Sequence, residues 1–267
     1  MRYAIGFTPS VCDPLTYAAA DWLGRNPYSD ALCEQPHVAG FSTAEFAFLT
    51  AVPRRFGFHG VLRPLFRLAD GMTEADLLYA LMRFTSELSP FSIGRLSVQL
   101  KDSCFMLAPA GASAEVNALA AMILQRFEPF RAMLSDAEIE RRDPDRLSAA
   151  QFANLLRWGD PFVLDDYRFH MMVTGPVPAP SQLRMATALQ TFFEPFCLAP
   201  LEINSLALFV EAGAGAPMRV HSQHPLGKLP AHRVRPRTAA PIEDGHLPAP
   251  VGETRVALAM RALVPAR

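Results

Sequence analysis

The sequence lacks the features that define several large classes of protein. Its 267 residues include only four cysteines, widely scattered, so neither a disulfide framework nor a zinc site is expected. No run approaches the roughly 20 apolar residues that cross a bilayer, so we expect no membrane span. The N-terminus shows no long apolar region followed by a small-residue cleavage site. A reduced, cytoplasmic protein is therefore predicted.

An excess of charge of one sign is also missing. The 25 Lys and Arg residues nearly balance the 26 Asp and Glu residues, which leaves a net charge of −1. This balance gives no whole-protein attraction for nucleic acid, so RNA is the less favoured partner. Any anion site must come from a local basic cluster. Because half of the residues are hydrophobic, a sizeable core is expected rather than global disorder.

An internal repeat organises the chain. FGFHGVLRP surrounds His59 in the first half, and YRFHMMVTGP surrounds His170 in the second. Both segments read aromatic-x-aromatic-His, then an apolar stretch and a proline. Each is followed by a helical pattern that ends in Pro-Phe, and then by a strand-like run. The repeated order indicates two similar lobes with the functional site between the two histidines.

Hydrophobic periodicity predicts an α+β fold. The expected helices cover residues 15–23, 74–88, 113–130, 135–142, 148–158 and 181–193. The expected strands cover residues 3–7, 167–173 and 201–211, with a hairpin within 91–107. Residues 45–52 fit either a strand or a short helix. The region 113–158 is interpreted as a helical insertion between the lobes of a domain that spans residues 1–227.

The paired segments resemble the motifs of the two-histidine (2H) phosphoesterase superfamily, which includes LigT-like RNA cyclic phosphodiesterases. Within it, the chain more closely resembles proteins of unknown function that are associated with phosphonate metabolism. The similarity extends to FEPFRAMLSDAEIERR and LSAAQFANLLRWGDPFV and covers roughly residues 1–227. It implies a bilobal fold whose two small antiparallel sheets, flanked by helices, are related by a pseudo-twofold axis. It also implies that no metal or other cofactor is used.

The resemblance assigns roles to the two histidines. His59 and His170 match the general acid and base that hydrolyse a cyclic phosphodiester. Histidine suits both roles because its ordinary pKa of roughly 6.5 lies close to neutral pH. The implied activity is that of a cyclic phosphodiesterase acting on a small cyclic-phosphate or otherwise phosphorylated ligand, with a link to phosphonate metabolism.

The chain departs from the superfamily pattern at the two hydroxyl positions. A Thr or Ser normally follows two residues after each histidine, but Val61 and Met172 stand there. Loss of one such donor commonly costs about a hundredfold to a thousandfold in rate. Arg63, expected on the same strand face as Val61, and Thr174 are the predicted phosphate-binding replacements. The alternative is a catalytically impaired protein that binds a phosphorylated ligand or nucleotide.

Three weaker signals remain. Arg54 and Arg55, before the first motif, fit either the cleft or a solvated turn. His221 and His224 lie in a loop-like stretch without cysteine or carboxylate neighbours, so we interpret them as ordinary loop residues rather than metal ligands. Residues 228–267 are rich in Pro and Arg and are predicted to form a tail, in which the more apolar residues 251–264 fit either a final strand or a helix.

Overall fold

A seven-stranded antiparallel sheet dominates the structure, a computed structural model that describes residues 1–111 and 113–227. The predicted tail, 228–267, lies outside the described residues. Across the sheet the strands are β4 (Leu96–Lys101), β5 (Cys104–Pro109), β6 (Met171–Pro176), β2 (Gly60–Phe66), β1 (Arg2–Phe7), β8 (Ser205–Glu211) and β9 (Met218–Pro225). A second, two-stranded sheet pairs β3 (Phe91–Ser92) with β7 (Glu202–Ile203).

Eight α-helices and three 3-10 turns complete the described part of the chain. They are α1 (Pro14–Leu23), α2 (Thr43–Leu49), α3 (Ala51–Phe56), α4 (Glu74–Ser86), α5 (Ala114–Arg126), η1 (Glu128–Phe130), α6 (Asp136–Glu140), η2 (Pro144–Arg146), α7 (Ala149–Trp158), η3 (Leu164–Asp166) and α8 (Ala179–Cys197). The α+β prediction is confirmed, and the ambiguous stretch 45–52 is helical. None of the described helices is both long and apolar enough to span a membrane.

Local sequence signals explain several helix ends. The Asp13 carboxylate accepts a hydrogen bond from the Leu15 amide at the start of α1, and Gly24 ends that helix with φ 78°. Thr73 and Asp76 form a reciprocal capping box at the start of α4. These caps are the features that made the helices predictable from the sequence.

The repeat seen in the sequence is a repeat of whole elements. The series β1, α1, β2, α4, β3, β4 corresponds to β5, α5, β6, α8, β7, β8. The hydrogen-bonding partners correspond as well, because β1 pairs with β2 and β8 just as β5 pairs with β6 and β4. In each repeat, short helices precede the strand that follows the histidine. The helix α5, inside the predicted insertion 113–158, is therefore part of the repeat.

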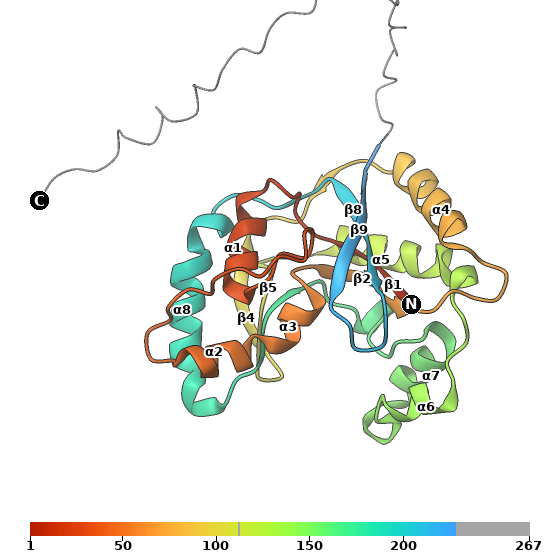
Figure 1. Cartoon of the computed structure of the whole chain (residues 1–267). Coiled ribbons are helices and arrows are strands. Elements are labelled where there is room, and N and C mark those ends of the chain that lie inside the picture. Colours follow the sequence, from red (N-terminus) through yellow and green to blue (C-terminus); the bar gives the residue numbers. More distant parts are fainter. Residues whose placement is uncertain (112, 228–267) are drawn as a thin grey trace, which may run out of the picture. The chain divides into compact units, whose positions relative to one another are not determined.

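The two halves of the sheet meet in the middle. The β6 half contains β4, β5 and β6, and the β2 half contains β2, β1, β8 and β9. The helix after β1 packs near β6, whereas the helix after β5 packs against β2, so the halves exchange a helix. Helix α8 packs against β4 and contacts α1, and α4 packs near β8 and β9 (Figure 1).

The main hydrophobic core lies on one face of the sheet. Alternate side chains of the strands, such as Ile5, Leu107, Met171 and Leu208, pack there against α1, α2, α4, α5 and α8. The opposite face carries a smaller buried cluster of Ala4, Ala207, Phe209 and Met218, against which Phe56 at the end of α3 packs. We call this second side of the sheet, with Ala4, Ala207, Phe209 and Met218, the histidine face.

The strand predictions needed two corrections. Strand β6 begins at Met171, so the aromatic residues of the second motif precede the strand rather than form it. Residues 218–225 form the edge strand β9, although the sequence favoured a loop. The edge strand is hard to recognise because its side chains are mostly polar and only one of them is fully buried.

A glycine lets the two motifs interlock. Gly60 is the register partner of Met171, the only pairing of Cα positions between β2 and β6. The ring of Phe169 lies over Gly60, so that a Cβ at this glycine would stand only 2.2 Å from the ring. Phe169 and Phe58 are both buried in the main core, whereas Phe56 at the end of α3 packs on the opposite face of the sheet.

We predict that Gly60→Ala destabilises the protein by about 3 kcal/mol, because the new methyl group must displace the Phe169 ring from a packed core. The measurement is the free energy of unfolding in urea. Gly213→Ala is the matched control, since a Cβ there meets nothing within 4 Å. The Phe169→Leu exchange should recover part of the loss when combined with Gly60→Ala. Additive losses in the double variant would contradict the proposed overlap.

Candidate functional site

The two motif histidines flank the junction of the two halves. His59 and His170 each stand one residue before the paired residues Gly60 and Met171. In an antiparallel pair this arrangement puts both on the face opposite to the paired residues, diagonally across the two strands. Diagonal neighbours of this kind are separated by roughly 7–8 Å. A group the size of a phosphate fits between side chains at that spacing.

The two imidazoles make the same backbone contact. His59 Nδ1 lies 3.0 Å from the Gly57 carbonyl oxygen, and His170 Nδ1 lies 2.8 Å from the Arg168 carbonyl oxygen. A carbonyl can only accept, so Nδ1 of each ring carries a proton and donates it. Nε2 of each ring is then available to exchange a proton with a ligand. The two histidines therefore have the same tautomer as well as equivalent positions in the repeat.

Glycines shape the environment of His59. Gly57 has φ 76° and ψ 164°, a conformation essentially restricted to glycine, and this turn aims its carbonyl at His59. On β1, a Cβ at Gly6 would lie 3.1 Å from the His59 ring and 2.7 Å from the Gly60 carbonyl oxygen. Gly6 thus leaves the space that the imidazole occupies, and Gly57 supplies the carbonyl that the imidazole contacts.

His59 is buried and stacked on an aromatic ring. Its exposed fraction is 7%, and its ring centroid lies 4.4 Å from that of Phe209 on β8. Burial, together with the nearby positive charge that His170 can carry, lowers the pKa of His59 to about 4, although the bond to Gly57 acts in the opposite direction. His59 is therefore neutral at neutral pH. Phe209 gave no signal in the sequence because it lies far from either motif.

The degenerate motif positions line the same face with apolar side chains. Val61 pairs with Gly6, and Met172 pairs with Met106 of β5. Both Val61 and Met172 are half-buried. Neither provides a hydrogen-bond donor beside the histidines.

Arg63 does not lie where the sequence placed it. Ile5 pairs with Arg63 while Gly6 pairs with Val61, so one extra residue of β2 lies between these two pairs, a β-bulge. The bulge turns Arg63 to the main-core side, away from Val61. There its guanidinium is 1% exposed and donates to the Leu124 carbonyl and to Glu128 at 2.9 Å. This position corrects the expectation that Arg63 shares a face with Val61.

The second predicted phosphate ligand is also engaged elsewhere. Thr174 is fully buried, and its Oγ1 accepts a hydrogen bond of 2.9 Å from the Phe105 amide. This contact lies where the pairing of β5 and β6 is irregular, between Cys104 and Met106. The hydroxyl replaces a missing backbone partner at the irregularity. Thr174 therefore stabilises the sheet instead of facing a ligand.

The two arginines before the first motif have separate roles. Arg54 donates to the Leu23 carbonyl, Gln35 and Thr50, and so ties α3 to its neighbours. Arg55 instead reaches the buried carboxylate of Glu211 at 2.8 Å. Its side chain remains 39% exposed.

The remaining predicted histidines join a polar network at the edge of the sheet. His221 Nε2 lies 3.2 Å from Glu74, and Ser222 lies 2.8 Å from His224 Nε2. Glu74 could not be predicted as a neighbour of His221, because α4 is distant from β9 in the sequence. Within residues 1–111 and 113–227, no group of three or more His, Cys, Asp or Glu side chains is arranged to hold a metal ion.

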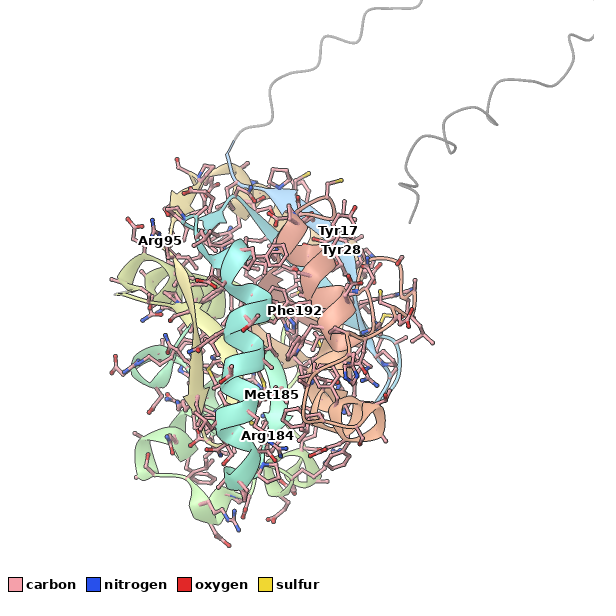
Figure 2. All side chains as sticks on the ribbon, turned by 90° about the vertical axis from the view of Figure 1, so that its left-hand side faces the viewer. Tyr17, Tyr28, Arg95, Arg184, Met185 and Phe192 are labelled. Atoms are coloured by element: carbon pink, nitrogen blue, oxygen red, sulfur yellow. The ribbon has the colours of Figure 1, made fainter. Side chains whose placement is uncertain are left out.

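A large groove among the described residues lies away from the histidines. It has a volume of about 1200 Å³ and lies between α1, α8 and residues 36–39. Tyr17, Trp22, Arg184 and Phe192 are among its lining residues, and Figure 2 shows α1 and α8 running side by side there. Neither His59 nor His170 lines this groove. Its size alone therefore does not make it the reaction site.

The fold and the histidine face define an α+β protein built from two related halves, with one histidine from each half at their junction. The profile of one protein family, described as "Protein of unknown function (DUF1045)", matches residues 61–219. The match covers more than half of the chain. The chain therefore belongs to the DUF1045 family.

Two curated relatives carry the name ribose 1,5-bisphosphate phosphokinase PhnN. The protein of Janthinobacterium sp. (strain Marseille) is 33% identical over 221 residues, which cover 81% of this chain and 49% of the relative. The protein of Laribacter hongkongensis (strain HLHK9) is 30% identical over 223 residues, which cover 82% of this chain and 50% of the relative. The chain thus spans about half the length of the curated relatives it matches.

The burial of His59 predicts a specific loss of stability in acid. The unfolded chain binds a proton at this side chain near its ordinary pKa of 6.5, whereas the folded protein does so only at about 4. Stability linked to His59 is thus complete above pH 6.5 and is lost as the pH falls from 6.5 to 4, by about 2–3 kcal/mol. In His59→Gln this component of the slope should vanish in urea titrations between pH 7.5 and 4. The same exchange at the exposed His37 is the control, and an unchanged slope in His59→Gln would contradict the assignment.

Proposed function

We propose that this protein hydrolyses a small cyclic phosphodiester, with His59 and His170 as the general acid–base pair. The observation that carries the proposal is the equivalent geometry of the two imidazoles, each with Nδ1 bonded to the carbonyl two residues earlier. The resemblance of the two motifs to 2H phosphoesterases supports the same pairing. Two proton-transfer groups about a phosphate's width apart are what such a hydrolysis requires.

The reaction needs one proton removed and one supplied. The Nε2 atom of the base takes a proton from water as the water oxygen forms a bond to phosphorus. The bond from phosphorus to one ester oxygen breaks, and the Nε2–H of the acid protonates that oxygen. The products are a phosphomonoester and a free hydroxyl on the same molecule, and a second proton exchange between the histidines restores the starting state.

We assign the base role to His59. Its lowered pKa of about 4 keeps it unprotonated at neutral pH, as a base must be at the start of the reaction. An anionic phosphate bound beside the ring raises its pKa toward the working pH and so strengthens it as a base. His170, which is less buried, then acts as the acid.

The developing negative charge needs a donor that Val61 and Met172 do not provide. Arg168 is the nearest cationic side chain in the sequence to His170, and it is exposed. Among the residues that the structure describes, its Nη1 donates only to backbone carbonyls, those of Asp165 and Tyr167. Because neither contact is an ion pair, the guanidinium can turn toward a bound phosphate at little cost. We assign Arg168 to the non-bridging oxygens.

The relatives' name favours a ribose phosphate as the substrate class. Phosphokinases often hold nucleotide phosphates with a Gly-x-x-x-x-Gly-Lys-Ser/Thr loop, and the 267-residue sequence contains no such pattern. We therefore transfer the ribose phosphate chemistry to this chain but not the kinase step. Opening of a ribose 1,2-cyclic phosphate at the 2-oxygen yields a ribose 1-phosphate. The link of the proposed role to phosphonate metabolism rests on the resemblance of the motifs alone.

We predict that His59→Ala and His170→Ala each lower kcat about a hundredfold to ten-thousandfold on the responsive substrate, because each removes one proton transfer. The assay is phosphomonoester release from ribose 1,2-cyclic phosphate and from a panel of 2′,3′-cyclic nucleotides. The double variant should be about as slow as the slower single variant, since the two residues act as a unit.

His37→Ala serves as the control because this exposed side chain is not part of the pair. Turnover that survives in the His59→Ala, His170→Ala double variant would place the reaction elsewhere.

The apolar residues at the hydroxyl positions favour one rival function, a protein that binds a phosphorylated ligand without turnover. The Val61→Thr, Met172→Thr variant separates the two. Under our proposal it increases an existing kcat, by up to about a hundredfold, since it restores donors beside the phosphate. Calorimetric binding by the wild type without turnover, with activity appearing only in the variant, would favour the rival.

A further inference from the structure

An arginine pair with a single buried carboxylate lies at the far end of the histidine face. Glu211, the last residue of β8, is fully buried. It accepts hydrogen bonds from Arg2 Nε at 2.5 Å, Arg55 Nη2 at 2.8 Å and the Gly215 amide at 3.2 Å. Burial alone would raise the pKa of Glu211, but the two arginines outweigh burial and lower it. The carboxylate is therefore ionised, and the cluster carries one uncompensated positive charge.

The guanidinium of Arg55 is only partly satisfied. Its Nε atom is buried without a hydrogen-bond partner among the described residues, and its only ion-pair partner there is Glu211. Its Cζ atom lies 5.0 Å from the centre of the Phe56 ring, which itself packs on the second buried cluster. The side chains of Arg2 and Arg55 are 33% and 39% exposed, so an anion in solution can reach them.

The cluster shares its face with His59. Ala4 pairs with Phe209, and Arg2 pairs with Glu211, two residues further along both strands. The Phe209 ring stacks on His59 with 4.4 Å between ring centroids. A Cβ at Gly6 would lie 3.1 Å from the His59 ring, and Arg2 stands four residues before Gly6, or roughly 13 Å along β1. The arginines therefore lie on the same face at a spacing close to the full length of a sugar that carries a phosphate at each end.

We infer that Arg55 and Arg2 form a second anion subsite, which holds a terminal phosphomonoester on the same substrate whose cyclic phosphate lies between the histidines. The inference rests on the proposed function for the position of the reacting phosphate. The substrate class is thereby narrowed to sugar phosphates with one cyclic and one terminal phosphate. The terminal phosphate supplies the missing negative charge beside Arg55 and accepts charge-assisted hydrogen bonds from the pair.

Such a subsite also compensates for the hydrogen-bond donors that are missing at the two motif hydroxyl positions. Binding energy from a remote group of the substrate can position the reacting group and compensate for weak contacts at the reaction centre. A substrate without the terminal phosphate loses this contribution. We therefore expect the protein to prefer the doubly phosphorylated substrate, and we expect this preference to depend on Arg55.

The test is calorimetric titration with ribose 5-phosphate, a probe that needs no turnover. We expect wild type to bind the probe and Arg55→Gln to bind it about tenfold to a hundredfold more weakly. Arg95→Gln is the matched control, since Arg95 is an exposed arginine on the edge of the β6 half and makes no side-chain ion pair with described residues. Equal affinity for the probe in wild type and Arg55→Gln, or no binding by wild type, overturns the inference.

Two further measurements separate this inference from the proposed function. The His59→Ala, His170→Ala variant should bind ribose 5-phosphate as wild type does, even if no substrate is ever turned over. If Arg55→Gln lowers the thermal midpoint of unfolding, the titration is repeated with Arg2→Gln. In that variant Arg55 still neutralises Glu211. A purely structural role would leave the probe affinity of a folded Arg2→Gln variant unchanged, and that result also counts against the subsite.

Discussion

The single backbone pairing of Gly60 with Met171 is the contact on which the site depends. It joins the two halves of the sheet, and each histidine stands one residue before it. The ring of Phe169 lies against Gly60, so the aromatic residue of the second motif packs on the strand of the first. Separation of the halves would therefore also separate the histidines. The junction that holds the fold together is the same element that sets the spacing of the proposed acid and base.

The bulge in β2 explains how one strand serves two purposes. Before it, His59 and Val61 face the side that Phe209 occupies; after it, Arg63 turns to the helix-covered side. There Glu128 bridges Arg63 and Arg131, at 2.9 and 2.7 Å. A buried arginine is costly unless it is paired and hydrogen-bonded, and this bridge supplies both conditions. The first motif thus ends in a structural anchor for α5 and η1.

The sequence alone predicted what is local or repeated. The capped helices, the α+β class and the correspondence of elements followed from periodicity and from the two motifs. The strand β9 was not predicted, because the sequence of an edge strand with polar side chains lacks hydrophobic alternation. The bulge was not predicted, because strict alternation along a strand assigns Arg63 to the same face as Val61. The positions of Phe209 and Glu211 near the site were not predicted, because their neighbours come from β1, β2 and α3. No spacing in the sequence indicates such contacts.

The apolar positions beside the histidines and the arginines further along the face form one consistent electrostatic arrangement. Val61, Met172 and Phe209 make the surroundings of His59 poor in polar groups, which favours its neutral state. The same scarcity deprives a bound phosphate of close donors. Attraction for an anionic substrate must then come from charges at longer range, and in a medium of low dielectric such charges act over several ångströms. In the proposed reaction, Arg168 beside His170 and the Arg2–Arg55 pair beyond Phe209 would supply such charges, so an anionic substrate would bind while His59 remains unprotonated.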